Sequence, residues 1–306
     1  MPASRFLAVC LNPVIQNTLV FDRILRGEVN RTGEHRVDAS GKGVNVARVL
    51  GQLGCEALYL AQLGGPTREW FLAMCEADGV RTRWAESNSE IRVCTTVIDR
   101  AEGHATELVE EARTVGEGTT ERLLAEYALV LPGCDAVIVS GTKAAGFAED
   151  TIPSIVRLAA QAGKRIYLDI KGADLVASLP FRPVLVKPNL EELLQTRSPV
   201  GDAKLVRDEA SLRAFVAAVG REYSESFGAS LIVTRGARST WYWEDGELRD
   251  CPASKIEAIN PTGSGDSFMA GAAAAMEEGG TLKEAVAEGM RLGSLNAQRL
   301  KPGSIL

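Results

Sequence analysis

Short apolar runs alternate along the chain with stretches in which apolar residues recur at helical spacing. The runs are rich in Val and Ile, as in strands that are buried on both faces, and strands separated by helices favour a parallel sheet. The predicted strands lie at residues 136–139, 165–168, 184–186 and 231–233. The predicted helices lie at residues 44–53, 68–76, 152–162 and 212–222. We therefore expect an α/β protein whose central sheet is covered by helices on both sides.

Two segments break this alternation. Residues 17–38 and 92–111 carry strand patterns with little helix between them. These strands could pair as a small separate sheet and form a lid over the C-terminal edge of the parallel sheet, where ligands bind in such folds. Because the sequence has no tandem repeat or linker, we expect residues 1–306 to form one domain, with a lid made by about 12–38 and 91–112.

Composition narrows the class of protein. With 306 residues, 45% apolar and 24% charged, the chain can bury a large core. The formal net charge of -6 disfavours a general nucleic-acid or membrane surface, since binding to polyanions requires a basic excess. The six cysteines form no C-x-x-C pair, which suggests neither a disulfide framework nor a zinc site. Without a recognisable leader or membrane span, a cytoplasmic protein with no nucleic-acid or membrane partner is expected.

The strongest candidate motif lies at residues 260–271 and leads into an alanine-rich helix. Gly263, Ser264 and Gly265 would leave their N–H groups unobstructed at the helix N-terminus, where orphan donors and the helix dipole attract anions. A phosphoryl group in transfer is such an anion. Asp266 follows in the first turn. Taken alone, that residue is better explained as a helix cap than as a functional acid.

A second glycine turn opens the predicted helix at 44–53. Gly41 and Gly43 would let a ligand approach the backbone, and Asn45 could bond hydroxyl groups through both halves of its amide. The spacing fits neither a Walker A loop nor a dinucleotide-binding glycine motif. Taken alone, a tight turn before a helix explains this segment as well as a binding site does.

Two further motifs each follow a predicted strand. Asn189 and Glu192 come after the strand at 184–186, with a spacing that is also typical of a capping box. Thr234 and Gly236 follow the strand at 231–233 and would, taken alone, form an ordinary turn. Neither motif identifies a site by itself.

In this order and spacing, the motifs resemble those of the ribokinase-like (PfkB) carbohydrate kinases, within the branch that contains 1-phosphofructokinase and tagatose-6-phosphate kinase. The resemblance covers essentially the whole chain. It includes the segments 11–13, 27–31 and 41–48, and residues 263–266, a mild variant of the family's G-A-G-D signature. It implies a three-layer αβα fold with a mostly parallel sheet and a small β-sheet lid. It also implies ATP-dependent phosphorylation of a hydroxyl on a sugar phosphate.

The resemblance further implies roles for individual residues. Asp266 would be the general base that removes the hydroxyl proton, and the amides of Gly263, Ser264 and Gly265 would form an anion hole. Asn189 and Glu192 would hold Mg²⁺, largely through water. The residues expected near ATP are Lys187, Asn189, Glu192, Thr234, Gly236 and Asn296. The residues expected near the sugar are Asn12, Gln16, Arg31, Gly41, Lys42, Gly43, Asn45, Arg92, Thr142, Lys143 and Lys171. The lid of this family commonly forms a homodimer interface, so a homodimer is a further expectation.

Three residues depart from the pattern of that branch. Gln16 stands where the branch has a carboxylate, while Lys143 and Lys171 stand where it has uncharged residues. At formal charges the pocket would be more positive by about three. One hypothesis is an acceptor with an extra anionic group, such as a carboxylate or second phosphate. The alternative is that the two lysines face solvent or form salt bridges with nearby acids.

Other functions compete with a sugar-phosphate kinase. A sensor that kept the fold without its chemistry would bind ligand but show no Mg²⁺-dependent turnover. A kinase for an unphosphorylated sugar or a nucleoside is a nearer alternative. His35 and His104 lie in the lid segments without cysteines or acids at ligand spacing, so a histidine metal site is not expected there.

Overall fold

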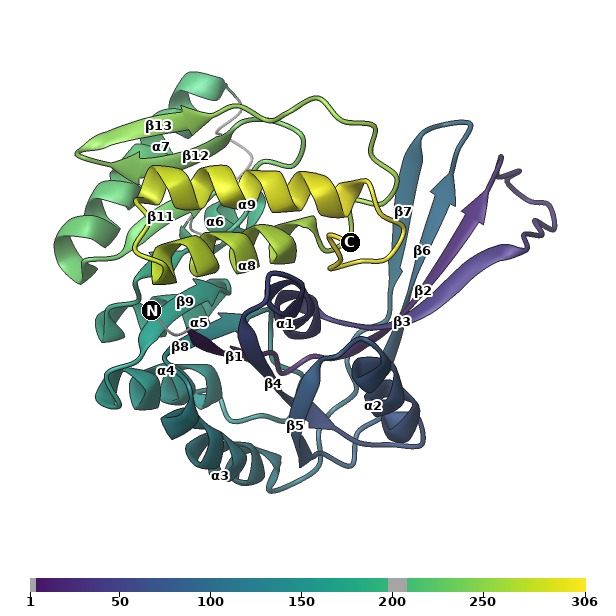
Figure 1. Ribbon diagram of the computed structural model, residues 1–306, viewed down its shortest axis with the longest axis horizontal. Coiled ribbons are helices and arrows are strands. Elements are labelled where there is room, and N and C mark those ends of the chain that lie inside the picture. The colour runs from purple at the N-terminus through teal and green to yellow at the C-terminus, as the bar shows by residue number, and fades with distance from the viewer. Residues whose placement is uncertain (1–3, 198–207) are drawn as a thin grey trace.

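A nine-stranded sheet forms the centre of the computed structural model, which describes residues 4–197 and 208–306 (Figure 1). Neighbouring strands from β11 to β5 run parallel, and β12 and β13 join antiparallel at one edge. From edge to edge the order is β13 (Glu247–Cys251), β12 (Thr240–Glu244), β11 (Ser230–Val233), β10 (Leu185–Val186), β9 (Arg165–Asp169), β8 (Ala136–Ser140), β1 (Arg5–Val9), β4 (Glu56–Leu63) and β5 (Arg81–Glu86).

Helices cover both faces of this sheet, which gives three layers (Figure 1). One face carries α1 (Lys42–Gln52), α2 (Arg68–Ala77), α8 (Ser264–Glu277) and α9 (Leu282–Ala297). The other face carries α3 (Thr119–Val130), α4 (Thr151–Gln161), α5 (Gly172–Ser178), α6 (Leu190–Arg197) and α7 (Glu209–Glu222). Short helical turns η1 (Leu131–Gly133), η2 (Leu179–Phe181) and η4 (Tyr223–Phe227) follow α3, α5 and α7.

The alternation of side chains along β1 explains why the core has two halves. Phe6 and Ala8 are buried among residues of α1, α2, α8 and α9, whereas Leu7 and Val9 are buried among residues of α3 to α7. Successive residues of a strand point to opposite faces, so a strand that is covered twice must be apolar throughout. The four strands and four helices predicted from the sequence are confirmed, with shifts of a few residues at their ends.

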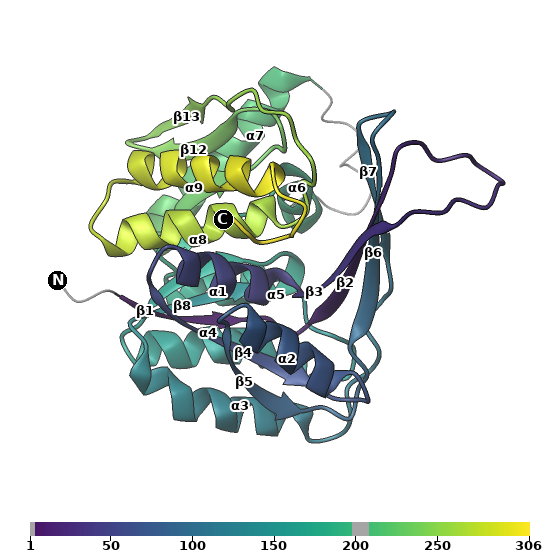
Figure 2. The same ribbon diagram turned by 45° about the vertical axis from the view of Figure 1, so that its right-hand side comes forward.

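A second sheet of four strands stands beside the large one, as the sequence predicts (Figure 2). Its order is β3 (Glu34–Ser40), β2 (Val14–Phe21), β6 (Arg92–Asp99) and β7 (His104–Val109). The two central strands, β2 and β6, pair in parallel, and each pairs antiparallel with its outer neighbour. β2 begins shortly after β1 ends, and β6 begins shortly after β5 ends. The base of the small sheet therefore lies at the carboxyl edge of the large one.

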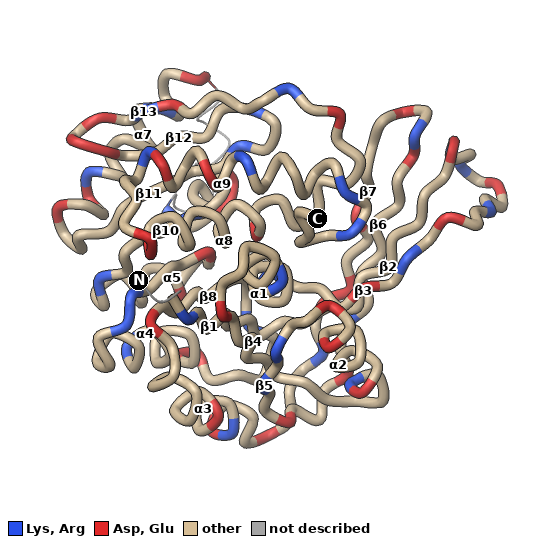
Figure 3. Tube along the Cα trace, viewed as in Figure 1, with Lys and Arg blue, Asp and Glu red and all other residues tan. Residues whose placement is uncertain are grey.

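Charged residues of both signs are interspersed along the trace, and Figure 3 shows no extended face of one sign in that view. The interspersed charges agree with the small formal net charge of -6. Among the described residues, no helix combines the length and the apolar character that are needed to span a membrane.

Candidate active site

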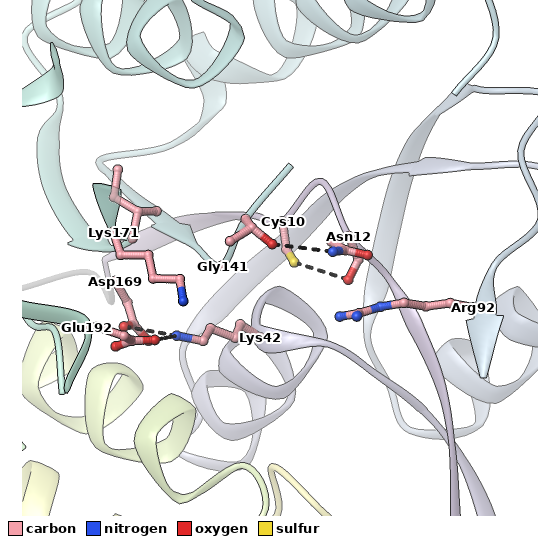
Figure 4. A pocket seen from close by; sticks show the side chains of 10 residues that line it. Cys10, Asn12, Lys42, Arg92, Gly141, Asp169, Lys171 and Glu192 are labelled. Carbon is pink, nitrogen blue, oxygen red and sulfur yellow. Dashed lines mark hydrogen bonds and ion pairs between the residues drawn. The ribbon is translucent and has the colours of Figure 1, made fainter. Parts of the chain in front are cut away.

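A pocket of about 180 Å³ lies at the carboxyl edge of the large sheet, and Arg92 at the start of β6 lines it from the small sheet (Figure 4). Open α/β sheets bind ligands at this edge because loops from several parallel strands end there. The lining residues come from the loops after β1 and β8, the end of β9, the starts of α1 and β6, and α6. They are Cys10, Asn12, Lys42, Arg92, Gly141, Thr142, Asp169, Ile170, Lys171 and Glu192.

Lys42 lies between two carboxylates of this pocket. Its Nζ is 3.3 Å from Asp169 Oδ1 and 3.3 Å from Glu192 Oε1, and Figure 4 shows it pointing at both. Lys187 Nζ lies 3.4 Å from the same Asp169 oxygen. Burial disfavours the ammonium, but Asp169 and Glu192 outweigh burial and raise the pKa of Lys42. Burial also disfavours the Asp169 carboxylate, but Lys187 and Lys42 outweigh it and lower the pKa. Lys42 and Asp169 are therefore both charged near neutral pH.

Asp266 occupies the first turn of α8 and is only 7% exposed. Its Oδ2 accepts a hydrogen bond of 2.7 Å from Nδ2 of Asn45 on α1. Burial raises the pKa of Asp266 to about 6, with Asp169 adding to the rise and Lys42 and Asn45 opposing it. A carboxylate with this pKa is mostly ionised at neutral pH, yet it takes up a proton more readily than an exposed one.

The turn before Asp266 brings three segments into close contact. Gly263 has φ +84°, and a Cβ at that position would lie 2.4 Å from the Gly303 nitrogen, so no larger residue fits. The N–H of Ser264 was expected to be free but donates to Pro261 O at 3.1 Å, which corrects its place in the anion hole. A Cβ at Gly265 would meet only Lys187 Nζ, at 3.8 Å. Gly265 is therefore open toward a lysine, which suits an approaching anion.

The Asn189 and Glu192 pair forms the capping box that its spacing allows. Asn189 N donates to Glu192 Oε2 at 2.9 Å, and Glu192 N donates to Asn189 Oδ1 at 2.8 Å. This leaves Glu192 Oε1 directed at Lys42 in the pocket. Asn189 also forms a β-bridge with Thr234, and Gly236 has a positive φ in the turn beyond. The two motifs after β10 and β11 therefore lie side by side.

The expected sugar residues divide into those that line the pocket and those that do not. Asn12 Nδ2 donates to Thr142 Oγ1 at 3.3 Å, and the buried Asn12 Oδ1 has no partner among the described residues. Figure 4 shows the Arg92 guanidinium pointing into the pocket from the small sheet. Gln16 is buried and donates to Thr96 Oγ1 at 3.0 Å, and Arg31 is exposed. Neither of these two lines the pocket.

The two unusual lysines differ from each other. Lys143 Nζ donates to Asp174 Oδ2 at 2.8 Å and to Glu149 O at 3.0 Å, and it does not line the pocket. Of the two alternatives for Lys143, the structure therefore shows the salt bridge with a nearby acid, and Lys143 is removed from the expected sugar residues. Lys171 lines the pocket, with Nζ 3.3 Å from Gln195 Oε1. Only one of the added positive charges therefore faces the ligand space.

Two other expected contacts have structural explanations. A Cβ at Gly43 would lie 2.6 Å from the Cβ of Cys10 and 2.8 Å from Tyr59, so this glycine lets α1 pack closely on the sheet. Gly41, in contrast, precedes α1 with φ +104°, next to Lys42, which lines the pocket. The Asn296 amide donates to Thr262 O and Ser264 Oγ, at 2.9 and 3.0 Å. Both of its N–H hydrogens thus hold the turn before Asp266 rather than a ligand.

Sequence reasoning assigned no role to Asp169, which is central to the pocket. The carboxylate is 1% exposed, and its Oδ2 has no hydrogen-bond partner within the described residues. Its position at the end of a buried parallel strand, two residues before Lys171, was the available signal. Cys10 and Arg48 were also missed, although both lie within or beside motifs that were recognised.

Comparisons with known proteins identify both a family and a fold. Residues 8–306 match the family model described as pfkB family carbohydrate kinase. A structure from Thermotoga maritima, described as a possible 1-phosphofructokinase, is 19% identical, with TM-score 0.85, and the match covers 97% of this chain and 93% of that one. Phosphofructokinase-2 from Escherichia coli in complex with fructose-6-phosphate is 21% identical, with TM-score 0.80 and coverages of 98% and 96%. Its tetrameric inhibited form is 22% identical, with TM-score 0.79 and coverages of 96% and 94%.

Proposed function

This chain belongs to the pfkB family of carbohydrate kinases, and from that premise we propose that it phosphorylates a hydroxyl of a sugar phosphate with ATP, using Asp266 as the general base. The observation that carries the proposal is the position of Asp266. The carboxylate is buried, held by Asn45 at 2.7 Å, and preceded by the glycine turn at the start of α8. An acid in that place combines a proton acceptor with a site that attracts phosphate.

The protonation state of Asp266 suits the step. Its pKa of about 6 leaves the carboxylate largely ionised at neutral pH, ready to accept the proton of the attacking hydroxyl. Because burial is the main cause of the raised pKa, the gain in basicity comes from exclusion of water. The Asn45 amide fixes one carboxylate oxygen, which leaves the other available to the substrate.

The residues present fit ATP and magnesium. When bound, Mg²⁺–ATP supplies the phosphoryl group and a cation that neutralises its developing charge. Lys42, Lys187 and the Gly265 amide are the groups that would hold the phosphates. Glu192 and Asn189 would hold the magnesium through water, because magnesium keeps several of its waters when it binds to proteins. Thr234 and Gly236 would contact the nucleotide from the adjoining turn.

Arg92 and Lys171 support a sugar phosphate as the acceptor. Both line the pocket, and Arg and Lys side chains bind phosphate groups through charge-assisted hydrogen bonds. The structurally similar phosphofructokinase-2 from Escherichia coli was solved in complex with fructose-6-phosphate, which is a sugar phosphate. Lys171 is also consistent with an acceptor that carries one further anionic group. Lys143 gives no support to that hypothesis, because it is paired with Asp174. Asn12 and Thr142 would bond the sugar hydroxyls, since Asn12 Oδ1 is buried without a partner among the described residues.

We further propose that the small sheet is the lid of this site and a surface for self-association. Arg92 stands at its base and points into the pocket, so movement of the sheet would carry a ligand contact with it. The outer strand β7 is exposed along its whole length, including Leu108 and Val109. An exposed edge strand with apolar residues can pair with the same strand of a second copy of this chain.

Coupled ADP release with a panel of acceptors tests this function. Fructose 1-phosphate, fructose 6-phosphate, tagatose 6-phosphate, their unphosphorylated sugars and bisphosphates should be compared at saturating Mg²⁺–ATP. We expect kcat/KM to be highest for a phosphorylated acceptor. Higher values for unphosphorylated sugars or nucleosides would overturn the acceptor class, and ligand binding without turnover of any acceptor would indicate a sensor.

A further inference from the structure

Arg48 is a buried arginine that donates four hydrogen bonds and to which the reaction outlined above assigns no role. It lies one turn after Asn45 on α1 and is 2% exposed. Its Nη1 donates to Asn45 Oδ1 at 3.1 Å and to Pro302 O at 3.0 Å. Its Nη2 donates to Ala39 O at 2.5 Å, and its Nε donates to Asp78 Oδ2 at 2.9 Å. A buried side chain with so many directed bonds can hold its neighbours in one geometry.

The contact with Asn45 determines which way the Asn45 amide faces. Asn45 Oδ1 accepts from Arg48 Nη1 and, at 3.2 Å, from Ser40 Oγ. A flipped amide would place its NH₂ group against the guanidinium, where two donors would face each other. Only the observed orientation leaves Nδ2 free to donate to Asp266.

We propose that Arg48 is a positioning residue, which fixes the Asn45 amide so that its N–H holds the Asp266 carboxylate in place for proton removal. The inference deepens the proposed function and rests on the role of Asp266 as the base. A lysine could not replace this arginine, because the planar guanidinium donates in several fixed directions at once.

The remaining partners of Arg48 tie this arrangement to two other segments. Ala39 is the penultimate residue of β3 in the small sheet, and Pro302 belongs to the C-terminal segment. Asp78 binds both Arg48 and Lys301 of that segment. Gly303 packs so closely on Asn45 that a Cβ there would lie 2.4 Å from the Asn45 Cβ. The position of the base therefore depends on contacts from the small sheet and from the chain end.

The charged and polar groups around Asp266 predict what the loss of Arg48 would do. They include Asn45 and Lys42 on α1, Cys10 after β1, Asp169 at the end of β9, and Lys187 after β10. The Asn45 bond stabilises the ionised carboxylate and so opposes the effect of burial. Without a fixed donor, Asp266 binds its proton more tightly, and the pH at which it ionises rises.

Arg48→Met tests the proposal, with Asp78→Asn as the matched control. Asp78→Asn removes the charged partner of Arg48 Nε but leaves the Asn45 contact intact. The first readout uses the protein without ligands and follows the Asn45 side-chain amide against pH by ¹⁵N–¹H NMR. The second readout is the acid limb of kcat/KM. Arg48→Met should raise both midpoints by about one pH unit, the equivalent of a lost charge-assisted hydrogen bond. Asp78→Asn should lower the melting temperature but leave both midpoints unchanged.

Unshifted midpoints in Arg48→Met would overturn the proposal and reduce Arg48 to a stabilising residue. If Arg48→Met does not fold, Arg48→Lys replaces it, since it keeps the charge beside Asp78 and should still shift the midpoints upward. Asp266→Asn separates this inference from the proposed function. Full turnover of Asp266→Asn would refute the base, whereas an inactive Asp266→Asn with unshifted Arg48 variants would refute the positioning role alone.

Discussion

Lys42 Nζ lies 3.3 Å from Oδ1 of Asp169, although 127 positions separate the two residues in the chain. The pair joins the start of α1 to the end of β9, and Glu192 Oε1 completes the arrangement from α6. Lys42 therefore contacts Glu192, which is proposed to hold the magnesium, and also Asp169, which lies two residues before Lys171 of the expected sugar site.

Lys42→Met should therefore affect catalysis more than folding. Without the ammonium, Asp169 and Glu192 repel each other and the transferred phosphoryl group loses a cation. We expect kcat to fall about 10²- to 10³-fold, the usual cost of one lost electrostatic contact in a transition state. Steady-state kinetics with circular dichroism as a folding control would measure this. A folded Lys42→Met enzyme with native kcat would contradict the role of Lys42.

The pH dependence should report Asp266. Its pKa is raised to about 6 by burial, and the ionised form is the active one, so kcat/KM should rise with pH and reach half its maximum near pH 6. Stability should change in the opposite sense. A carboxyl group with a raised pKa in the folded state stabilises the protein only while it is protonated, so its contribution is lost as the pH rises from about 4 to 6. An acid limb that stays near pH 4 would exclude Asp266 as the titrating group.

Lys171 and Lys143 provide a matched pair for testing recognition of the acceptor. Lys171→Ala removes a pocket cation and should raise KM for a phosphorylated acceptor about 10-fold or more. Lys143→Ala removes a lysine paired with Asp174 outside the pocket lining, so KM should change little while stability decreases slightly. Initial rates across acceptor concentrations would distinguish them. Equal effects of the two substitutions would argue against Lys171 as the contact.

The Thr96 hydroxyl links the small sheet to the turn before Asp266. It accepts from Gln16 Nε2 at 3.0 Å and lies 3.5 Å from Thr262 Oγ1. Thr96→Val should lower the free energy of unfolding by about 1 to 3 kcal/mol, because Gln16 keeps a buried donor with one partner fewer. Thr95→Val, on the neighbouring position of β6, is the control and should change it by less than about 0.5 kcal/mol. Urea denaturation would measure the free energy of unfolding of both variants. Equal losses would contradict a stabilising role of the Thr96 hydroxyl.

Much of the fold could be predicted because each element carries a local signal. The apolar runs of β8, β9 and β11 and the helical spacing of α1 and α4 depend only on nearby residues. The two segments that form the small sheet stood out because their strands lack intervening helices. Asp266 could be found as a candidate because the glycines before it and the helix after it are adjacent in sequence, but only the combination of motifs along the chain distinguished it from a helix cap.

What could not be predicted depends on contacts between distant residues. The sequence left open whether Lys143 faces the pocket or pairs with an acid, because its partner Asp174 on α5 is brought to it only by the fold. The engagement of Ser264 N–H by Pro261 O depends on the exact turn geometry. Arg48 contacts the small sheet and the C-terminal segment at once, which only the folded chain brings together.

The turnover of Asp266→Asn under saturating Mg²⁺–ATP and acceptor tests the central claim most directly. Asparagine has nearly the same shape but cannot accept the hydroxyl proton, so kcat should fall about 10²- to 10⁴-fold. Nucleotide binding, measured by calorimetry, should stay close to native. The melting temperature should not fall, and at alkaline pH it should rise because the substitution removes a buried charge. Native kcat in a folded, ATP-binding Asp266→Asn enzyme would contradict the assignment of Asp266 as the general base.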